Sequence, residues 1–433
     1  MDTTIERATM RKVYSRILPF AIVTYFFCYL DRINVGFAAL TMNKEIGLTA
    51  TSFGNAAGLF FWGYFLFEVP SNLILDKVGA RVWIARIMVT WGLISFATAF
   101  VTGPTSFTIL RFLLGIAEAG FFPGMILFFT YWFPEHHRGR IIGGFTVALP
   151  LAVGLGAPVS TAVMEMDGIL GFSGWRWLFM MEAIPAMLLG LAVLVLITDR
   201  PEQAGWLNKA ERAWLTRTLA KERAQKDAVR VYSMAAAMFN PNVLLLALHY
   251  FGIVTASLGM VYFIPQIIKQ LGLTNMQVGY TTMIPYLCGA VAMIVYGRQS
   301  DRAGERRWHL FFACVIACAG LLIAAATMGT WWSIVGMSIA AMGFYGSKGP
   351  FFAMPSMFMS GTAVAVSLAW INSLGNLGGY FGPSIVGYAH DTTGSFAPGI
   401  YILAGFAAMS AVVTAVALRI PCAIAARATM PAE

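Results

Sequence analysis

The sequence predicts an all-α membrane protein whose twelve transmembrane helices form two six-helix bundles, and three observations lead to this prediction. The 433 residues are 58% hydrophobic and 11% charged, whereas a soluble domain carries about 25% charged residues. About 250 residues are therefore hydrophobic, enough for about twelve membrane spans of roughly 20 residues each. A polar segment at 199–241 divides the apolar stretches into two groups of six. This composition excludes a soluble enzyme, a disordered chain and a single-span receptor.

The apolar stretches, divided at charges and turn residues, give the position of each span in order. The first run begins near Ile17 and continues past Asp31 and Arg32. It is too long and too charged for a signal peptide, so we expect it to remain as the first span. The predicted spans are 17–42, 52–75, 82–101, 106–131, 140–163, 176–197, 243–268, 277–299, 308–328, 331–354, 361–388 and 396–418.

The spans divide the chain into three predicted units. These are an N-terminal bundle at 1–198, a cytoplasmic linker at 199–241 and a C-terminal bundle at 242–433. The linker is rich in Glu, Lys, Arg and Gln, and its stretch 204–224 is compatible with a helix on the membrane surface. We expect it to connect the two bundles, and we expect the protein to be a monomer.

The basic residues predict the orientation in the membrane. If both termini are cytoplasmic, 23 of the 29 Lys and Arg residues lie on the cytoplasmic side, and only Lys44, Arg176 and Lys269 lie on the other. Because basic side chains are retained in the cytoplasm during insertion, we predict this orientation for a multi-pass protein of the cell's inner (cytoplasmic) membrane. The net charge of +9 is then a topology signal, and no nucleic-acid partner follows from it.

A short motif occurs once in each half, at the turn after the second span of that half. It consists of Asp, a basic residue, a spacer, Gly, a spacer and Arg, and its copies lie at 76–81 and 301–306. Duplicated six-span halves are typical of transporters whose substrate site lies between the repeats. We interpret the motif as a conformational latch, with substrate binding as the alternative, formed by Asp76, Arg81, Asp301 and Arg302.

The second copy, extended to 297–306, resembles the loop signature of the major facilitator superfamily, and the first copy departs from it because Asn72 replaces the leading Gly. Further stretches resemble the anion:cation symporter family of that superfamily and occur in the right order along the whole chain: 29–36, 111–120, 174–179 and 372–379. The resemblance implies the major facilitator fold. It also ties the positions of Asp31 and Glu118 to protonation and that of Arg32 to the substrate anion.

Asp31 and Arg32 lie near the middle of the first predicted span. A charge at the centre of a membrane helix costs about 2.5–3.5 kcal/mol, so each needs a partner or a function. Adjacent residues point about 100° apart on a helix, so the two face different neighbours. We expect Arg32 to hold a substrate carboxylate through paired hydrogen bonds and Asp31 to bind a proton or restrain Arg32. The alternative is a structural ion pair between them.

Arg111 and Glu118 are seven residues apart on the fourth predicted span, so they lie on nearly one face of the helix. Glu118 is expected near the middle of the membrane. A carboxylate in a low-dielectric cavity is readily protonated, which suits a group that must load and release a proton. We therefore predict that Glu118 couples transport to protons, with a structural pair to Arg111 as the alternative.

The central spans of the second half carry one basic residue, Lys348, between Gly and Pro residues that can interrupt the helix. We expect a second anion contact there, with snorkelling or structural pairing as alternatives. Asn372 and Asn376 share one helix face, where substrate binding and helix–helix contact are equally compatible with the sequence. Tyr64 is expected either to donate its hydroxyl to the substrate or to pack.

Other polar residues receive structural interpretations. Glu68 and Glu182 lie nearer the ends of their spans and are expected to be structural or gating groups. His136 and His137 are expected in a solvated loop without metal-ligand partners. The five cysteines show no paired framework, and no motif typical of enzymes occurs. We therefore predict no enzyme activity, no cofactor and no metal site.

Together these features predict a proton symporter that imports a small organic anion by alternating access. A sodium-coupled or uncoupled carboxylate carrier is the alternative mechanism, and a membrane nutrient sensor without transport is a further alternative. The expected partners are protons, the lipid bilayer and a carboxylate such as a sugar acid, tartrate, phthalate or hydroxyphenylacetate. The sequence does not select among these anions.

Overall fold

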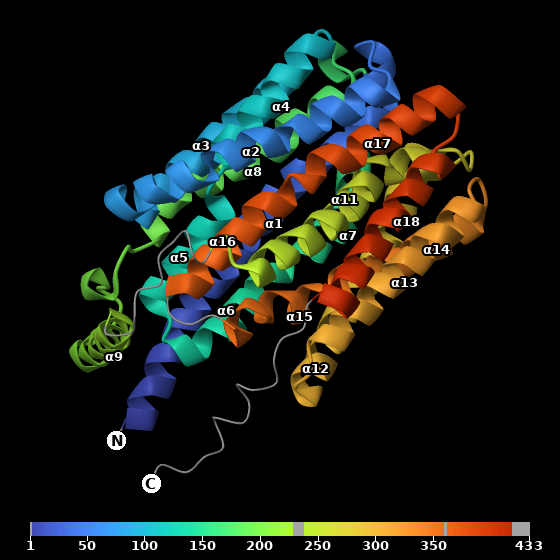
Figure 1. Ribbon diagram of the computed structural model, residues 1–433. Coiled ribbons are helices and arrows are strands. Elements are labelled where there is room, and N and C mark those ends of the chain that lie inside the picture. Colours follow the sequence, from blue (N-terminus) through green and yellow to red (C-terminus); the bar gives the residue numbers. More distant parts are fainter. Residues whose placement is uncertain (1, 228–237, 359–361, 418–433) are drawn as a thin grey trace.

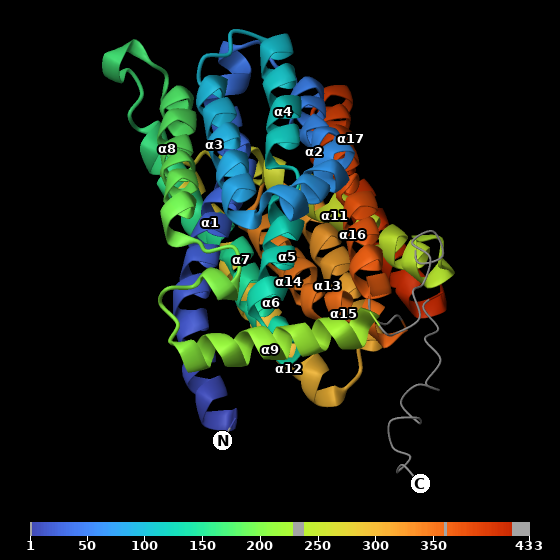
Figure 2. The same cartoon turned by 90° about the vertical axis from the view of Figure 1, so that its left-hand side faces the viewer.

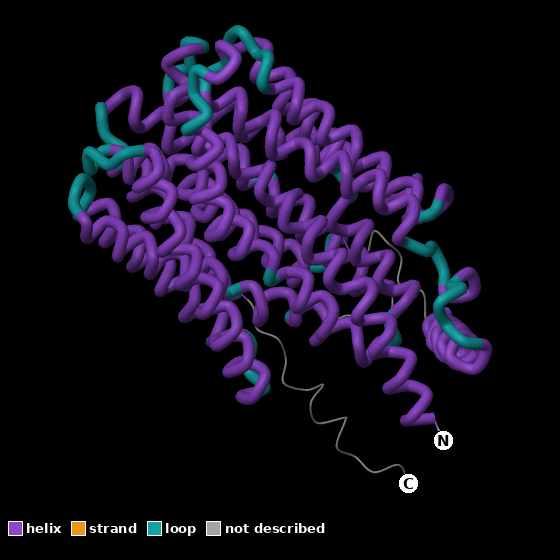
Figure 3. The backbone as a smooth tube through the Cα atoms, turned by 180° about the vertical axis from the view of Figure 1, so that it is seen from behind, coloured by secondary structure: helices purple, strands orange, loops and turns teal. Residues whose placement is uncertain are grey.

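The computed structural model describes residues 2–227, 238–358 and 362–417, and within these ranges every regular element is helical (Figures 1 and 3). Ten helical segments of this described part are long and apolar enough to cross a membrane. The two other predicted spans, 331–354 and 361–388, are each built from two shorter consecutive helices. The predicted all-α architecture of two six-helix bundles is confirmed.

The helices of the first half follow the predicted spans, with interruptions inside the fourth and fifth spans. They are α1 (Asp2–Glu45), α2 (Ala50–Val78), α3 (Ala80–Thr98), α4 (Pro104–Glu118), α5 (Phe121–Trp132), α6 (Glu135–Thr146), α7 (Ala148–Met164) and α8 (Gly174–Leu196). The first helix begins at Asp2 and not near Ile17, so it extends about 22 Å beyond the predicted span at the rise of an α-helix.

The second half repeats this arrangement after α9 (Lys209–Asp227). Its helices are α11 (Pro241–Lys269), α12 (Asn275–Ala303), α13 (Arg307–Ala326), α14 (Trp331–Gly346), α15 (Lys348–Ala353), α16 (Thr362–Asn376), α17 (Gly378–Thr393) and α18 (Ala397–Val412). Short helical turns of other types occur at Ile169–Gly171, Pro201–Gln203, Pro355–Met357 and Val413–Ala417.

The two ends of the molecule differ in what covers them. At one end, which we call the α9 face, the N terminus and α9 lie together, and α9 runs across the ends of the bundle helices (Figure 2). Two ion pairs attach α9 to the first bundle, from Lys12 to Glu211 at 2.7 Å and from Arg138 to Glu222 at 3.3 Å. The opposite face carries the loops that follow α1 and α3 (Figure 2).

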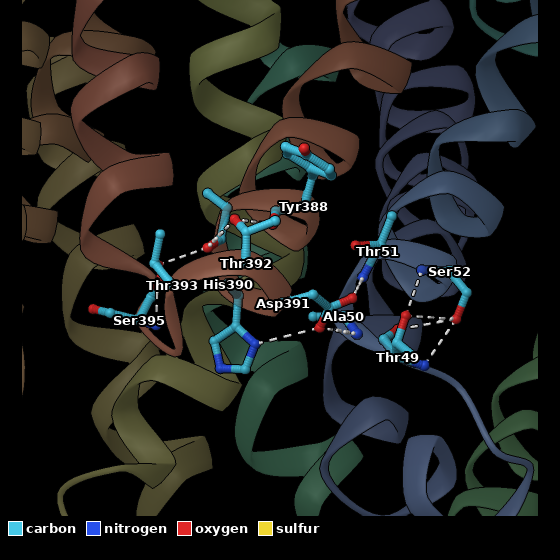
Figure 4. Close-up of polar contacts among 11 residues, drawn as sticks. Thr49, Ala50, Thr51, Ser52, Tyr388, His390, Asp391, Thr392, Thr393 and Ser395 are labelled. Carbon is cyan, nitrogen blue, oxygen red and sulfur yellow. Dashed lines mark hydrogen bonds and ion pairs between the residues drawn. The ribbon is translucent and has the colours of Figure 1, made fainter.

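The two bundles meet closely near the opposite face, where α2 packs on α17 and α7 packs on α12. Gly54 and Gly58 permit the first contact, since a Cβ atom on Gly58 would lie 2.8 Å from the Cα atom of Tyr380, and one on Gly54 would overlap the carbonyl of Pro383. At the end of the same interface the carboxylate of Asp391 accepts hydrogen bonds from the first amides of α2 (Figure 4). The bundles are therefore closed on this side.

Candidate functional site

An ion pair between Arg32 on α1 and Glu118 on α4 lies inside the first bundle. Nη2 and Nε of Arg32 donate to the same oxygen of Glu118, Oε2, over 2.7 and 3.3 Å. The Arg32 side chain is 12% exposed and that of Glu118 is 0% exposed. Because both charges are largely removed from water, loss of either partner would leave an uncompensated buried charge. Sequence spacing did not indicate this pair.

Glu118 is the last residue of α4, and the chain turns sharply just after it before α5 begins. The turn uses Gly120 at φ +89°, a left-handed conformation that favours glycine. A Cβ atom at this position would also overlap the side chain of Ser71 on α2. The interruption places the Glu118 carboxylate at a helix end inside the bundle, as in transporters whose discontinuous helices line the substrate site.

Aromatic rings surround the guanidinium of Arg32. It lies 4.9 Å from the ring centre of Phe60, 5.2 Å from that of Tyr64 and 6.0 Å from that of Tyr29. Such rings attract a cation through their negative faces and hold the planar guanidinium in one orientation. The structure thus places Tyr64 beside Arg32, where a substrate carboxylate bound to Arg32 would meet it.

Asp31, although adjacent to Arg32 in sequence, faces a different set of partners. Its Oδ1 atom accepts hydrogen bonds from the hydroxyl of Ser95 on α3 and, over 3.4 Å, from the amide of Asn34 on α1. The same Asn34 amide donates over 3.1 Å to Glu182 on α8. Asp31 therefore belongs to a buried polar chain on the side of α1 that faces α3 and α8, and not to the Arg32 ion pair.

Arg111 on α4 is a further buried cation near this ion pair. Its guanidinium lies 5.3 Å from the ring centre of Phe60, and it interacts electrostatically with both Asp31 and Glu118. Among the described residues no hydrogen-bond acceptor contacts its Nε or Nη2 atoms. The residue within ion-pair distance of Glu118 is Arg32. Arg111 is therefore a second cation of the site, and its Nε and Nη2 atoms remain free donors among the described residues.

In the second bundle, Lys348 lies where the helix is interrupted between α14 and α15, at Ser347. Its Nζ atom lies 5.3 Å from the ring centre of Tyr250 on α11. Tyr250 is also close enough to Arg32 and Glu68 of the first bundle to interact with them electrostatically. Tyr250 therefore lies near both Lys348 of the second bundle and Arg32 of the first.

Asn372 contacts the first bundle directly. Its amide donates over 2.8 Å to Oε1 of Glu68 on α2, and the neighbouring Ser373 donates to the other oxygen of the same carboxylate. Asn376 is the last residue of α16, and no described residue is hydrogen bonded to its side chain. The two asparagines therefore differ: Asn372 joins the bundles in this state, whereas Asn376 has a free amide.

The first copy of the repeated loop motif makes contacts within its own half. Asp76 accepts a hydrogen bond of 2.7 Å from the hydroxyl of Tyr131 on α5. The backbone amide of Arg81 donates over 2.7 Å to Asp199, which follows α8. These contacts join α2, α3, α5 and the end of α8 at the α9 face.

The second copy also makes local contacts. Asp301 forms an ion pair of 2.6 Å with Arg306, and Arg302 is exposed without an ion-pair partner among the described residues. Among the described residues, these polar contacts of both copies stay within their own halves, and the latch remains a prediction.

At the α9 face, the expectation that His136 and His137 lack ligand partners is wrong. The Nε2 atoms of His136 and His137 lie 2.8 and 3.4 Å from Oε1 of Glu6. The hydrogen bond from His136 lowers the pKa of Glu6. The sequence did not indicate this contact because Glu6 lies on the extension of α1, which was not predicted to be helical.

The thiol of Cys28 on α1 donates to Oε2 of Glu118 over 3.7 Å. Four further residues of the site were therefore not predicted: Cys28, Asn34, Ser95 and Ser373. One signal could have found Asn34, because it lies three residues after Asp31 and so on the same side of α1. The others lie on helices far apart in sequence, and their proximity follows from the packing of the bundles.

Comparison with known proteins identifies the family. A family profile described as Major Facilitator Superfamily matches residues 21–383. The chain belongs to this superfamily. A solved structure of this fold, the E. coli xylose transporter XylE in a partially occluded inward-open conformation, aligns with a TM-score of 0.73 and 14% identity over 93% of this chain and 99% of that one. This similarity supports the fold.

Two relatives of this superfamily chain are much more similar in sequence. A protein of Agrobacterium vitis named "Putative tartrate transporter" is 49% identical over 96% of this chain and 92% of its own length. A protein of Acinetobacter baumannii named "Quinolone resistance transporter" is 39% identical over 92% of both chains. The chain is therefore a multi-pass membrane transporter of a small organic molecule and not an enzyme.

Proposed function

We propose that the protein imports a small organic anion together with protons by alternating access. The observation that carries this proposal is the buried Arg32–Glu118 ion pair, because the Glu118 carboxylate occupies the donors that would bind a substrate carboxylate. Protonation of Glu118 removes its charge and releases the guanidinium for the substrate. Loss of that proton restores the ion pair and expels the anion, so proton and anion bind together and leave together.

Two features support a substrate with more than one acidic or polar group. Arg111 has free donors near Glu118, and Lys348 faces the space beside Tyr250 from the second bundle. Several cations near the Arg32–Glu118 pair suit a dicarboxylate or a hydroxylated acid, and Asn376 offers a free amide for hydroxyl groups. The name of the relative that is 49% identical makes tartrate the first anion to test.

The proposed direction of transport, import, combines the proposed orientation with a proton gradient directed into the cell. We place the α9 face, with both termini, in the cytoplasm of a cell whose inner membrane holds the protein, because most of the basic residues lie on that side. The contacts between α2 and α17 then close the outer side. Each net positive charge that moves inward gains about 2.3 kcal/mol per 100 mV, so two protons with a monoanion would be driven by voltage. The boundaries of the two bundles and the monomeric state remain predictions.

Uptake by proteoliposomes tests this proposal. The purified protein is reconstituted, and accumulation of labelled tartrate and of a panel of sugar acids and aromatic acids is measured with an imposed proton gradient, with an imposed sodium gradient and with neither. We expect accumulation that requires the proton gradient. Accumulation driven by sodium, or equilibration without a gradient, would contradict proton symport. Binding without flux would indicate a sensor.

A further inference from the structure

Glu182 on α8 is a buried carboxylate that the mechanism above does not use. Its side chain is almost completely buried, at 4% exposure. Both of its oxygens accept hydrogen bonds from neutral groups: Oε1 from the hydroxyl of Ser160 on α7 over 2.7 Å, and Oε2 from the amide of Asn34 over 3.1 Å. Within the described part of the chain, no basic side chain forms an ion pair with it. A buried carboxylate without a counter-charge is strongly destabilised unless it takes up a proton.

The surroundings of Glu182 contain a second carboxylate but no cation in direct contact. The helices that pack on α8 are chiefly α1, α3 and α7. From these, the titratable group that faces Glu182 is Asp31, which interacts with it electrostatically and shares the amide of Asn34. Asp31 is in turn faced from α3 and α4 by Ser95, Arg111 and Glu118.

The amide of Asn34 therefore bridges two carboxylates. One amide nitrogen donates to both, at 3.1 Å to Glu182 and 3.4 Å to Asp31. Two buried oxygen atoms here have no hydrogen-bond donor among the described residues. They are Oδ1 of Asn34 and Oδ2 of Asp31. A protonated carboxyl group supplies the donor that this arrangement lacks. Each of two carboxylates that share a site disfavours the negative charge of the other, and this favours a proton on one of them.

Asn34 lies three residues closer than Asp31 to the end of α1 at the opposite face, about 4.5 Å at the rise of a helix. In the proposed orientation, the residue that links the two carboxylates therefore lies on the outer side of Asp31 along α1.

The geometry points to Glu182 as a third proton-binding site of the transport cycle, linked to Asp31 through Asn34. This inference rests on the proposed proton symport. When Glu182 holds a proton, Asp31 is free to ionise. Protonation of Asp31 in turn allows Glu182 to release its proton. The pair therefore adds one exchangeable proton to the one that Glu118 carries.

The test compares Glu182→Gln with Ser160→Ala in proteoliposomes. Glutamine keeps the size and the polarity of the side chain but cannot bind a proton, whereas Ser160→Ala removes a hydrogen bond and keeps the carboxylate. The number of protons moved with each tartrate is measured from the pH gradient at which net uptake reverses, with the membrane potential held at zero and a fixed tartrate gradient. We expect Glu182→Gln to lower this number by one and Ser160→Ala to leave it unchanged. An equal number for Glu182→Gln and wild type would overturn the inference.

A second variant protects the test against a folding defect. Asn34→Ala keeps both carboxylates and removes their link, so we expect the proton number to stay the same while the pH dependence of tartrate exchange shifts. An unshifted pH profile in a folded Asn34→Ala protein would contradict the link. If uptake by the wild type does not depend on the proton gradient, the proposed symport is wrong, and this inference is wrong with it. If wild type is proton-driven and the variants do not differ from it, only this inference fails.

Discussion

Arg32 and Glu118 form an ion pair of 2.7 Å that joins two helices of one bundle and not the two bundles to each other. Polar contacts between the bundles include those from Glu68 to Asn372 and, at the opposite face, from Asp391 to the amide of Thr51. In the proposed mechanism, the ion pair acts in binding and coupling, whereas the contacts between the bundles act on the conformational change. A variant of the ion pair should change affinity or coupling, and a variant of an interface should change the rate of conformational exchange.

Arg32→Lys should weaken substrate binding while leaving the protein folded. Lysine keeps the charge but loses the paired donors and the planar group that lies beside Phe60 and Tyr64. A hydrogen bond to a charged group contributes about 1.5–3 kcal/mol, so we expect tartrate affinity to fall about 10- to 100-fold. Titration of the purified protein measures this. The control is Arg86→Lys, whose guanidinium lies beside Trp83 on α3, and its affinity should equal that of wild type.

Glu118→Gln should separate exchange from accumulation. The neutral side chain mimics the protonated state, so Arg32 stays available for the anion but the proton can no longer be carried. We expect counterflow exchange of tartrate to persist and accumulation driven by a proton gradient to fall sharply, since the proton carried by Glu118 is lost. Glu165→Gln, an exposed residue at the end of α7, is the control and should accumulate normally. Full accumulation by Glu118→Gln would exclude it as the coupling group.

Gly54→Val should block closure of the opposite face. A side chain at this position would overlap the backbone of Pro383 across the interface between α2 and α17. Overpacking of this kind costs about 1–3 kcal/mol, which here would act on the closed state. We expect a transport rate lower by tenfold or more with substrate binding retained. Gly405→Val is the matched control, because a side chain on that α18 residue meets no other atom within 4 Å.

The sequence predicted the spans well because the membrane requires long apolar segments, and these are visible without any knowledge of packing. It did not predict the extension of α1, since residues 2–16 are mostly polar and only Met10 and Val13 continue the buried face of Ile17. That extension is held by contacts with distant segments, from Lys12 to Glu211 and from Glu6 to His136. Such contacts depend on the fold and not on local sequence.

The charged residues of the site could likewise be identified from the sequence, because charges are rare within the spans. Which of them form pairs could not be identified in this way. The neighbours Asp31 and Arg32 suggested an ion pair, yet the helix turns them apart, and Arg32 meets Glu118, 86 residues away. Glu68 and Asn372 are 304 residues apart, and no spacing rule joins them. Sequence therefore identifies which groups carry charge inside the membrane, and only tertiary packing decides which of them meet.

Asp391 closes the opposite face through a helix terminus. Its carboxylate accepts hydrogen bonds from the amides of Ala50 and Thr51 over 3.1 and 2.8 Å, and His390 lies beside it (Figure 4). The residue lies beyond the predicted span 361–388. Partial burial acts to raise its pKa, but the hydrogen bonds with Thr51 and with the first turn of α2 prevail and lower the pKa to about 2. The negative charge also interacts favourably with the positive end of the α2 dipole.

Asp391→Asn should therefore destabilise the closed state, by about 0.3–1 kcal/mol for loss of the charge at the helix end. Because the pKa is lowered in the folded protein, the stabilisation is fully present above the ordinary value near 3.8 and is lost as the pH falls toward 2. The melting temperature of the variant should lie below that of wild type from about pH 5 to 8, and the difference should shrink below about pH 4.

Asp167→Asn is the control for Asp391→Asn, because Asp167 accepts a hydrogen bond from the first amide of α8 within one bundle. Both variants should melt earlier, but only Asp391→Asn should also change the rate of tartrate exchange. Equal exchange rates in the two variants would mean that the Asp391 contact does not gate transport.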